Sequence, residues 1–301
     1  MVSAVSNVGA VAVPGRRAGS YRTRLAARRT GFFVLIAIFV VASLFPFYWI
    51  VITSLKTQAE INAGTSSLLP GHVTFSNYID DFTQQGFLRP LINSIIVSVA
   101  TTVVTVVLAS LAGYALSRTR LRGKGAILGF ILLASFFPLL AMVGPLFIVY
   151  RKIGLLNSYP GLVIACLIYT LPLATFLLQN YFSLIPRELE EAAAVDGLTR
   201  VRALYKVIMP VALPAVFTVT ILSFILAWND FTFALSFMTT ANHYTAPLAI
   251  VTLGQTATAG QYQIFYNLID ASVVIISLPI ALIVIFAQRR IVAGLTAGAL
   301  K

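Results

Sequence analysis

The residues best suited to chemistry gather in one polar stretch, Pro186–Pro210, which reads PRELEEAAAVDGLTRVRALYKVIMP. Glutamates come early, Gly197 stands in the middle, and basic residues fill the second half. This pattern does not suit covalent catalysis, but it does suit a short docking helix. Acids near a helix N-terminus are favoured by the helix dipole, and three consecutive alanines favour a helix that a partner can approach closely.

The chain has few residues that could support catalysis or metal binding. The only histidines are His72 and His243, in separate polar segments, and the single cysteine, Cys166, lies inside an apolar run. These residues supply neither a catalytic set nor a metal-ligand cluster. No G-x-x-x-x-G-K-[ST] motif is found, so we expect no ATP site on this chain. We therefore predict a protein that is not an enzyme, with no catalytic residue and no metal.

The polar stretch predicts a helix, a glycine turn and a second helix. Pro186 suits a first helical turn, Gly197 suits a left-handed stop, and Thr199 suits an N-cap. Met209-Pro210 leads into the next apolar run. A DNA-binding helix-turn-helix is excluded because both ends of the stretch run directly into apolar segments. A membrane-surface amphipathic helix remains the alternative to a docking helix.

The elements that must position this stretch are membrane helices. Hydrophobic residues make up 59% of the 301 residues and charged residues only 10%, against about 25% charged in soluble domains. The fold class is therefore an all-α polytopic membrane protein with six transmembrane helices and a cytoplasmic coupling helix. The expected spans are Gly31–Ile52, Leu91–Leu116, Ala126–Tyr150, Ser158–Phe182, Pro210–Leu235 and Leu268–Gln288.

Basic residues set the predicted orientation. Of the 21 Lys and Arg residues, 17 fall in the N-terminal segment, the loops after the second and fourth runs, and the tail. By the positive-inside rule both termini are cytoplasmic, in a bacterial inner membrane. The net charge of +12 is spread between apolar runs rather than along one face, which argues against a nucleic-acid partner. We expect residues 1–30 to be an Arg-rich, largely disordered segment, residues 31–288 the transmembrane domain with its loop at 186–210, and residues 289–301 a cytoplasmic tail.

The polar stretch also resembles a known family motif. Glu191-Ala192-Ala193, then Gly197, then Val207-Ile208-Met209-Pro210 are similar to the "EAA" loop of permease subunits in binding-protein-dependent ABC importers. The family pattern has Ile and Leu where this chain has Val207 and Met209. Ala227-Trp228-Asn229-Asp230 resembles a signature of carbohydrate-importer permeases, and the tail from Gln288 resembles that of the smaller maltose permease subunit. The likeness runs from Gly31 to Lys301 and leaves the Arg-rich N-terminus unexplained.

The resemblance implies a mechanism and partners. It implies a second homologous permease, a dimer of ATPase subunits that holds ATP and Mg²⁺, an extracytoplasmic solute-binding protein, a sugar substrate and surrounding lipid, with no cofactor on this chain. By the resemblance, the ATPase-coupling residues are Glu190, Glu191, Ala192, Ala193, Asp196, Gly197, Met209 and Pro210. The tail residues Gly294, Leu295, Thr296 and Gly298 would lie at the ATPase interface. Asn242, Tyr244, Gln255 and Gln261 would lie in the loop that faces the binding protein.

Two questions stay open at this stage. Asn93, Asn229 and Asp230 are candidates for the solute pathway or a gate, although for Asp230 we favour the role of an interfacial carboxylate that caps a helix or meets water. The long external loop Ser236–Asn267 has no Lys, Arg, Asp or Glu, which mildly favours a neutral solute. The alternatives are an ABC permease for glycerol phosphate or a polyamine, and a secondary transporter, which would need buried ion-binding groups that this sequence lacks.

Overall fold

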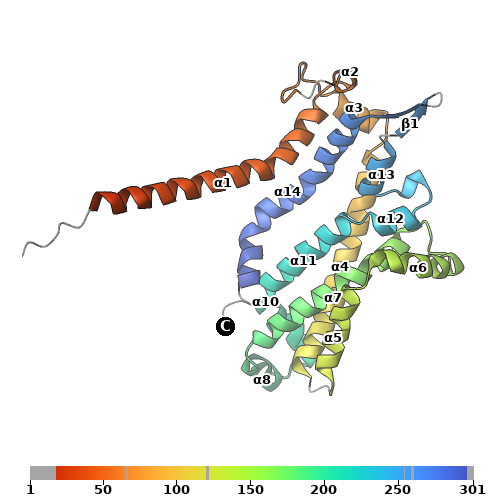
Figure 1. Ribbon diagram of the computed structural model, residues 1–301. Helices are drawn as coiled ribbons and strands as arrows, with labels where there is room; N and C mark the ends of the chain where they lie inside the picture. The colour runs from red at the N-terminus through yellow and green to blue at the C-terminus, as the bar shows by residue number, and fades with distance from the viewer. Residues whose placement is uncertain (1–17, 65–66, 120–121, 254, 259–260, 297–301) are drawn as a thin grey trace, which may run out of the picture. The chain divides into compact units, whose positions relative to one another are not determined.

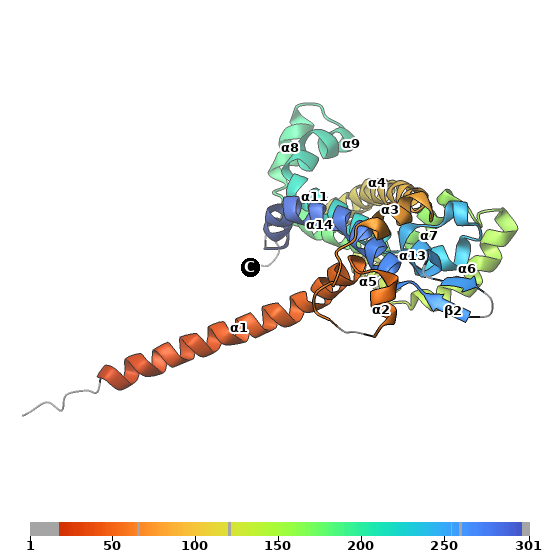
Figure 2. The same ribbon diagram turned by 90° about the horizontal axis from the view of Figure 1, so that it is seen from above.

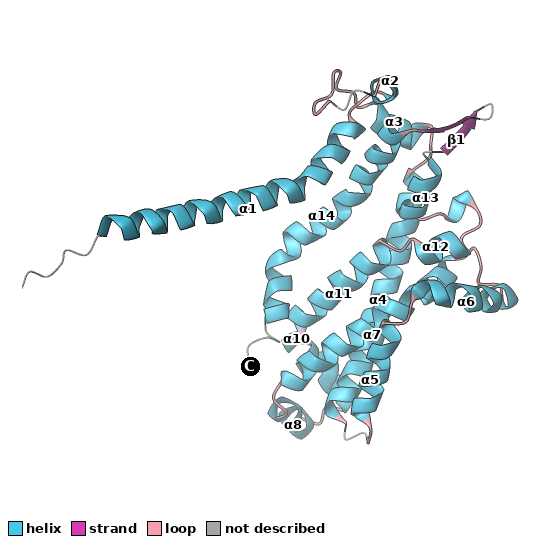
Figure 3. Cartoon of the chain, in the orientation of Figure 1, coloured by secondary structure: helices cyan, strands magenta, loops and turns pink. Residues whose placement is uncertain are grey.

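The computed structural model describes residues 18–64, 67–119, 122–253, 255–258 and 261–296. Helices dominate these residues (Figure 3). In chain order the elements are α1 (Ala18–Ser54), α2 (Gln58–Asn62), α3 (Ser76–Thr83), α4 (Leu88–Arg118), α5 (Lys124–Ser135), α6 (Leu139–Ile153), α7 (Tyr159–Leu184), α8 (Glu188–Val195), α9 (Arg200–Ala203), the π-helical turn η1 (Leu204–Ile208), α10 (Met209–Val211), α11 (Leu213–Trp228), α12 (Thr232–Phe237), the 3-10 turn η2 (Ala241–His243), α13 (Ala246–Leu253), β1 (Gln255–Thr258), β2 (Gln261–Ile264) and α14 (Tyr266–Thr296).

Long apolar helices confirm a multi-pass membrane protein. Within the described residues, four helices are long and apolar enough to cross a membrane: Arg29–Ser54, Leu88–Arg118, Tyr159–Leu184 and Tyr266–Ala287. Two bent pairs raise the number to six if each pair forms one span. They are Lys124–Ser135 with Leu139–Ile153, bent by 92°, and Arg200–Val211 with Leu213–Trp228, bent by 86°.

The bends correct two of the expected spans. The third run breaks at Phe136–Pro138, because Pro138 has no backbone N–H and adopts an extended ψ of 117° before α6 begins. The fifth run ends at Trp228, and a second short helix, α12, follows it. Hydropathy sums over a window, so it cannot distinguish a straight span from a broken one.

The chain divides into two compact units, Met1–Trp49 and Ile50–Lys301. The first holds most of α1, whose side chains from Arg29 to Tyr48 are exposed. The α1 helix begins at Ala18, so residues 18–30 are helical and not disordered as expected. Arginine and alanine are good helix formers, and they extend the apolar helix toward its N-terminus. Residues 1–17 lie outside the described part.

The second unit is built around α4 and α7, which lie side by side along most of their length (Figure 1). Small residues allow this close approach. A side chain added at Gly113 would come within 3.0 Å of the Gln179 backbone nitrogen on α7. The hydroxyls of Thr105 and Thr170 join the same two helices at 2.8 Å. Small residues and hydroxyl contacts are the usual means of association inside a bilayer, where hydrophobic contrast is absent.

The two ends of this unit differ. In Figure 1, α8 lies at one end of the spans, whereas α3 and β1 lie at the other. The β1–β2 hairpin pairs Gln255 with Ile264 and Thr258 with Gln261 in antiparallel register. An all-helical chain was expected, so this hairpin, which is confined to a loop, is an addition to the predicted fold.

Candidate functional site

The first half of the α8–α10 loop (residues 186–212) folds as the sequence predicts. Helix α8 carries three glutamates in its first turn. It ends at Gly197, whose φ of +78° is accessible to glycine at little cost. Two amides close the turn: Gly197 N bonds Ala194 O at 3.0 Å and Leu198 N bonds Ala193 O at 2.9 Å. This is the glycine-stopped helix end that was expected.

The second half of the loop is a helical segment that is anchored on the core. Thr199 caps it, accepting a hydrogen bond from Arg202 N at 3.4 Å, as predicted. Leu204 and Ile208 in η1 are almost fully buried in a cluster that includes Phe182 of α7. At Ala212 the chain turns by 86° into α11. Of the predicted docking residues here, Met209 is half-buried and Pro210 is exposed.

Helix α8 has two distinct faces. Glu191, Ala192 and Val195 are exposed, Val195 at 88% of its full surface, and Asp196 and Gly197 continue this face. Ala193 is only 3% exposed and faces the protein's own core. The prediction placed Ala193 among the docking residues, but in the free chain it packs inward, because it lies on the opposite side of the helix from Val195. In Figure 2, α8 and α9 stand out from the rest of the second unit.

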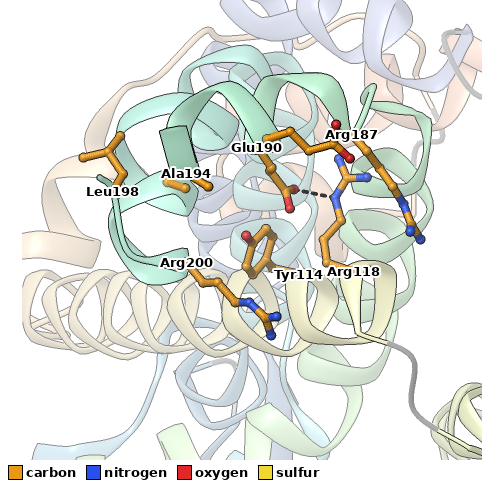
Figure 4. A pocket seen from close by; sticks show the side chains of 9 residues that line it. Tyr114, Arg118, Arg187, Glu190, Ala194, Leu198 and Arg200 are labelled. Atoms are coloured by element: carbon orange, nitrogen blue, oxygen red, sulfur yellow. Dashed lines mark ion pairs between the residues drawn. The ribbon is translucent and has the colours of Figure 1, made fainter. Parts of the chain in front are cut away.

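Glu190, which the resemblance placed among the docking residues, is only partly exposed and forms an ion pair on the inward face of α8. Arg118 Nε is 2.6 Å from Glu190 Oε1, and the side chains are 8% and 22% exposed (Figure 4). Arg118 Nη2 also donates to Ile185 O, at the end of α7, at 2.8 Å. Beside this pair lies a pocket of about 200 Å³. Its lining includes Tyr114, Arg187, Arg200 and Leu198.

Asn93, a candidate for the pathway or a gate, is an anchor for the loop around η2 in this structure. It is 2% exposed, and its Nδ2 donates to Asn242 O at 2.9 Å and to Tyr244 O at 2.8 Å. Tyr159 donates to Asn93 Oδ1 at 2.7 Å. Both amide hydrogens and the carbonyl are therefore engaged. The side chain ties α4 to α7 and to the loop around η2.

The acid of the Trp-Asn-Asp signature also has a structural partner. Asp230 is 8% exposed, and its Oδ2 accepts a hydrogen bond from Ala234 N at 3.0 Å, which caps α12. This is the capping role that the sequence left open. Asn229 is exposed and donates to Ile225 O at 2.7 Å. Trp228 is buried and donates to Ile276 O of α14 at 3.2 Å.

The remaining predicted residues are described only in part. Gln255 and Gln261 lie on the two strands of the hairpin, and Gly294, Leu295 and Thr296 lie near the end of α14. The side chains of all five are outside the described part of the chain, as is the whole of Gly298. No group of three or more His, Cys, Asp or Glu residues suited to a metal occurs within the described residues.

Sequence reasoning missed Arg118 and Tyr114. Arg118 was assigned to a basic loop that sets orientation, because nothing in its local pattern points to Glu190. Helical spacing could have paired Tyr114 with Arg118, since residues four apart share one face of a helix. That signal does not reveal which loop the shared face meets.

This geometry defines a helical multi-pass membrane protein with a structured loop that projects between two spans. Comparison with known proteins identifies the family. Residues 105–296 match the model of the binding-protein-dependent transport system inner membrane component. The chain is 41% identical over 278 residues to the trehalose transport system permease protein SugB of Mycobacterium tuberculosis, covering 92% of this chain and all of SugB. It is 39% identical over 269 residues to the sulfoquinovosyl glycerol transport system permease protein SmoH of Agrobacterium fabrum, covering 89% and 93% of the two chains.

A solved structure shares the fold. A chain of a bacterial ABC transporter that imports the acidic polysaccharide alginate superposes with a TM-score of 0.73 at 27% identity, covering 88% of this chain and 97% of that one. The chain therefore belongs to the binding-protein-dependent transport system inner membrane components. It is a permease subunit of an ABC importer, and ATP hydrolysis belongs to a partner chain.

Proposed function

We propose that this permease subunit carries a sugar, such as a disaccharide or a small glycoside, delivered by an extracytoplasmic binding protein. Its curated relatives are named for such solutes: trehalose for SugB, sulfoquinovosyl glycerol for SmoH, and trehalose and maltose for a 37% identical permease of Thermococcus litoralis. The external loop Ser236–Asn267 carries no Lys, Arg, Asp or Glu, which suits a neutral partner or ligand.

The α8 end of the spans is assigned to the cytoplasm, together with both termini. Arg118, Lys124 and Arg187 flank the spans at this end, whereas Arg151 and Lys152 close α6 near the other. The positive-inside rule then orients the chain in the inner membrane. The α3 end, with the hairpin and the loop around η2, faces the binding protein through residues such as Asn242 and Tyr244.

The observation that carries the coupling proposal is the exposed face of α8. Glu191, Ala192, Val195 and the turn at Gly197 present a small, rigid surface between two spans, and the buried inward face holds it in place. A partner ATPase would dock here, with ATP and Mg²⁺ bound to the ATPase and not to this chain. A second, related permease completes the pathway. The residues of the α14 tail are proposed to meet the same ATPases.

The test is a pull-down from native membranes in mild detergent, followed by mass spectrometry. The wild type is compared with Gly197→Asp and with Gly154→Asp. Gly154 is a matched control because its φ of +71° imposes the same backbone strain, and like Gly197 it has no atom within 4 Å of an added Cβ. It lies at the end of α6, at the opposite end of the spans.

We expect the wild type and Gly154→Asp to bring down both an ATPase and a second permease. Gly197→Asp should lose the ATPase. A wild-type chain that comes down alone at every detergent strength would refute the coupling proposal. Uptake of labelled sugars by cells that carry the wild type then tests the substrate class. Uptake of glycerol phosphate or a polyamine instead would refute the sugar assignment.

A further inference from the structure

Arg118 joins three elements through one side chain. It is the last residue of α4. Its guanidinium forms an ion pair with Glu190 of α8, with Nε 2.6 Å from Oε1, and donates a hydrogen bond to the carbonyl of Ile185, just after α7, at 2.8 Å. A guanidinium is always charged and carries five N–H donors, so one group can pair with a carboxylate and donate to a carbonyl at the same time. The ends of the two main core helices and α8 therefore meet at this single group.

The Arg118–Glu190 contact lies where α8 does not pack closely against α4. Helix α8 packs mainly on α9 and η1, while the pocket of about 200 Å³ opens beside it, toward Tyr114 of α4. Figure 4 shows Glu190 directed toward Arg118, with Tyr114 beside them. The aromatic ring of Tyr114 is held in turn by an edge contact with Phe182 of α7, with ring centres 6.3 Å apart. Polar contacts through Arg118, more than apolar packing, thus connect α8 to the end of α4.

The pair is separate from the face that a partner would contact. Glu190 and Ala193 lie one turn apart on the inward side of α8, whereas Ala192 and Val195 are on the exposed side. The Arg118 side chain is 8% exposed, so a protein that docks on α8 from outside does not need to touch it. Loss of the pair can therefore alter how α8 is held without altering the docking surface.

We propose that Arg118 and Glu190 are positioning residues that make α8 move as one body with the ends of α4 and α7. This inference rests on the proposed function. When a partner ATPase displaces α8, the displacement passes through the guanidinium into the two helices that form the centre of the span bundle. Without the pair, α8 would follow the ATPase while the spans lag behind, and ATP would be hydrolysed with little transport.

The experiment uses the whole transporter in proteoliposomes, with its ATPase, second permease and binding protein, and trehalose as the first sugar tested. Three quantities are measured: ATPase retained in a pull-down, ATP hydrolysed, and sugar moved per ATP. The variants are Arg118→Gln, Glu190→Gln, their double substitution and Arg118→Lys. The control is Arg122→Gln, which removes an exposed arginine from the neighbouring loop. Thermal unfolding of each purified variant excludes a folding defect.

We expect each single variant to retain the ATPase and to lower sugar moved per ATP by about fivefold, a coupling typical of residues in one ion pair. The double variant should be no worse than Arg118→Gln, because both substitutions break the same contact. Arg118→Lys should fall between the wild type and Arg118→Gln, because an ammonium keeps the charge that pairs with Glu190 but lacks the second nitrogen that donates to Ile185 O. Arg122→Gln should match the wild type.

Two outcomes would overturn the inference alone. One is loss of the ATPase in the pull-down by Glu190→Gln, as with Gly197→Asp, which would make Glu190 part of the docking surface. The other is an unchanged ratio of sugar to ATP in every variant, which would leave the ion pair with a purely local role. A wild-type chain that binds no ATPase would overturn the proposed function as well, so the two failures are distinguishable.

Discussion

The contact between α4 and α7 at Gly113 offers a sharp test of how the core is packed. An added Cβ at this position would lie 3.0 Å from the Gln179 backbone nitrogen and 3.3 Å from two Leu178 atoms. Backbone atoms inside a helix cannot rotate away as a side chain can. Gly113→Ala must therefore separate the two helices by a few tenths of an ångström, and contacts along the shared surface are lost.

The magnitude follows from two opposing effects. Overpacking of a tight interface costs about 2 kcal/mol, within the usual range of roughly 1–3. Replacing glycine by alanine inside a helix stabilises it by about 1 kcal/mol. The net loss expected for Gly113→Ala is about 1 kcal/mol. Gly129→Ala in α5 is the matched control, because an added Cβ there meets nothing within 4 Å and only the favourable effect remains.

The assay uses the single cysteine of the chain. Cys166 is 0% exposed, so a thiol-reactive fluorescent dye reports unfolding of the purified protein on heating. The two variants should differ by about 2 kcal/mol, which corresponds to roughly 3 °C in the midpoint for a chain of this length. Gly113→Ala should melt below the wild type, and Gly129→Ala at or above it. If Gly113→Ala melts as high as Gly129→Ala, the close approach of α4 and α7 is wrong.

Two further predictions concern the α3 end of the spans. Asn93→Ala removes both donors to the carbonyls of Asn242 and Tyr244, at a cost of about 2 kcal/mol. Amide hydrogen exchange should then accelerate around η2 but not in the middle of α4. If η2 stays as protected in the variant as in the wild type, the anchoring role is contradicted. Burial raises the pKa of Asp81 from 3.8 to about 6, despite a hydrogen bond from Ser272 that lowers it. The folded protein then holds the Asp81 proton more tightly than the unfolded chain does. The contribution of Asp81 to the free energy of unfolding therefore falls as pH rises from about 4 through 6. Asp81→Asn should remove that part of the pH dependence of the melting midpoint, measured by tryptophan fluorescence at several pH values, and an unchanged dependence would exclude Asp81 as its source.

Much of the fold could be predicted because bilayer thickness and local chemistry act on contiguous residues. The spans α4, α7 and α14 were expected from apolar length alone, and the stop at Gly197 and the cap at Thr199 follow from single residue types. The 92° bend at Pro138 could be predicted only in part, because a proline predicts either a kink or a helix cap without saying which.

The side-chain partners could not be predicted, because they depend on which surfaces meet in space. The sequence marks Asn93 and Asp230 as unusual polar residues near membrane helices. It does not say that one ties three segments together and the other caps α12. Likewise, a row of alanines in α8 does not reveal that Ala193 faces inward while Ala192 faces outward.

The anchors of the α8–α10 loop bear on how the loop could transmit force. A loop tethered only at its two ends would bend when a partner pushed it, and little of the displacement would reach the spans. Here the second half of the loop is fixed by buried apolar side chains at Leu204 and Ile208, and the first half by the ion pair at Glu190. The apolar anchor is non-directional and tolerates small slips, whereas the ion pair joins α8 to one charged group at the end of α4. A displacement of α8 would therefore rotate the loop about its apolar anchor and pull on Arg118. The ends of α4 and α7 would then be the first parts of the bundle to move.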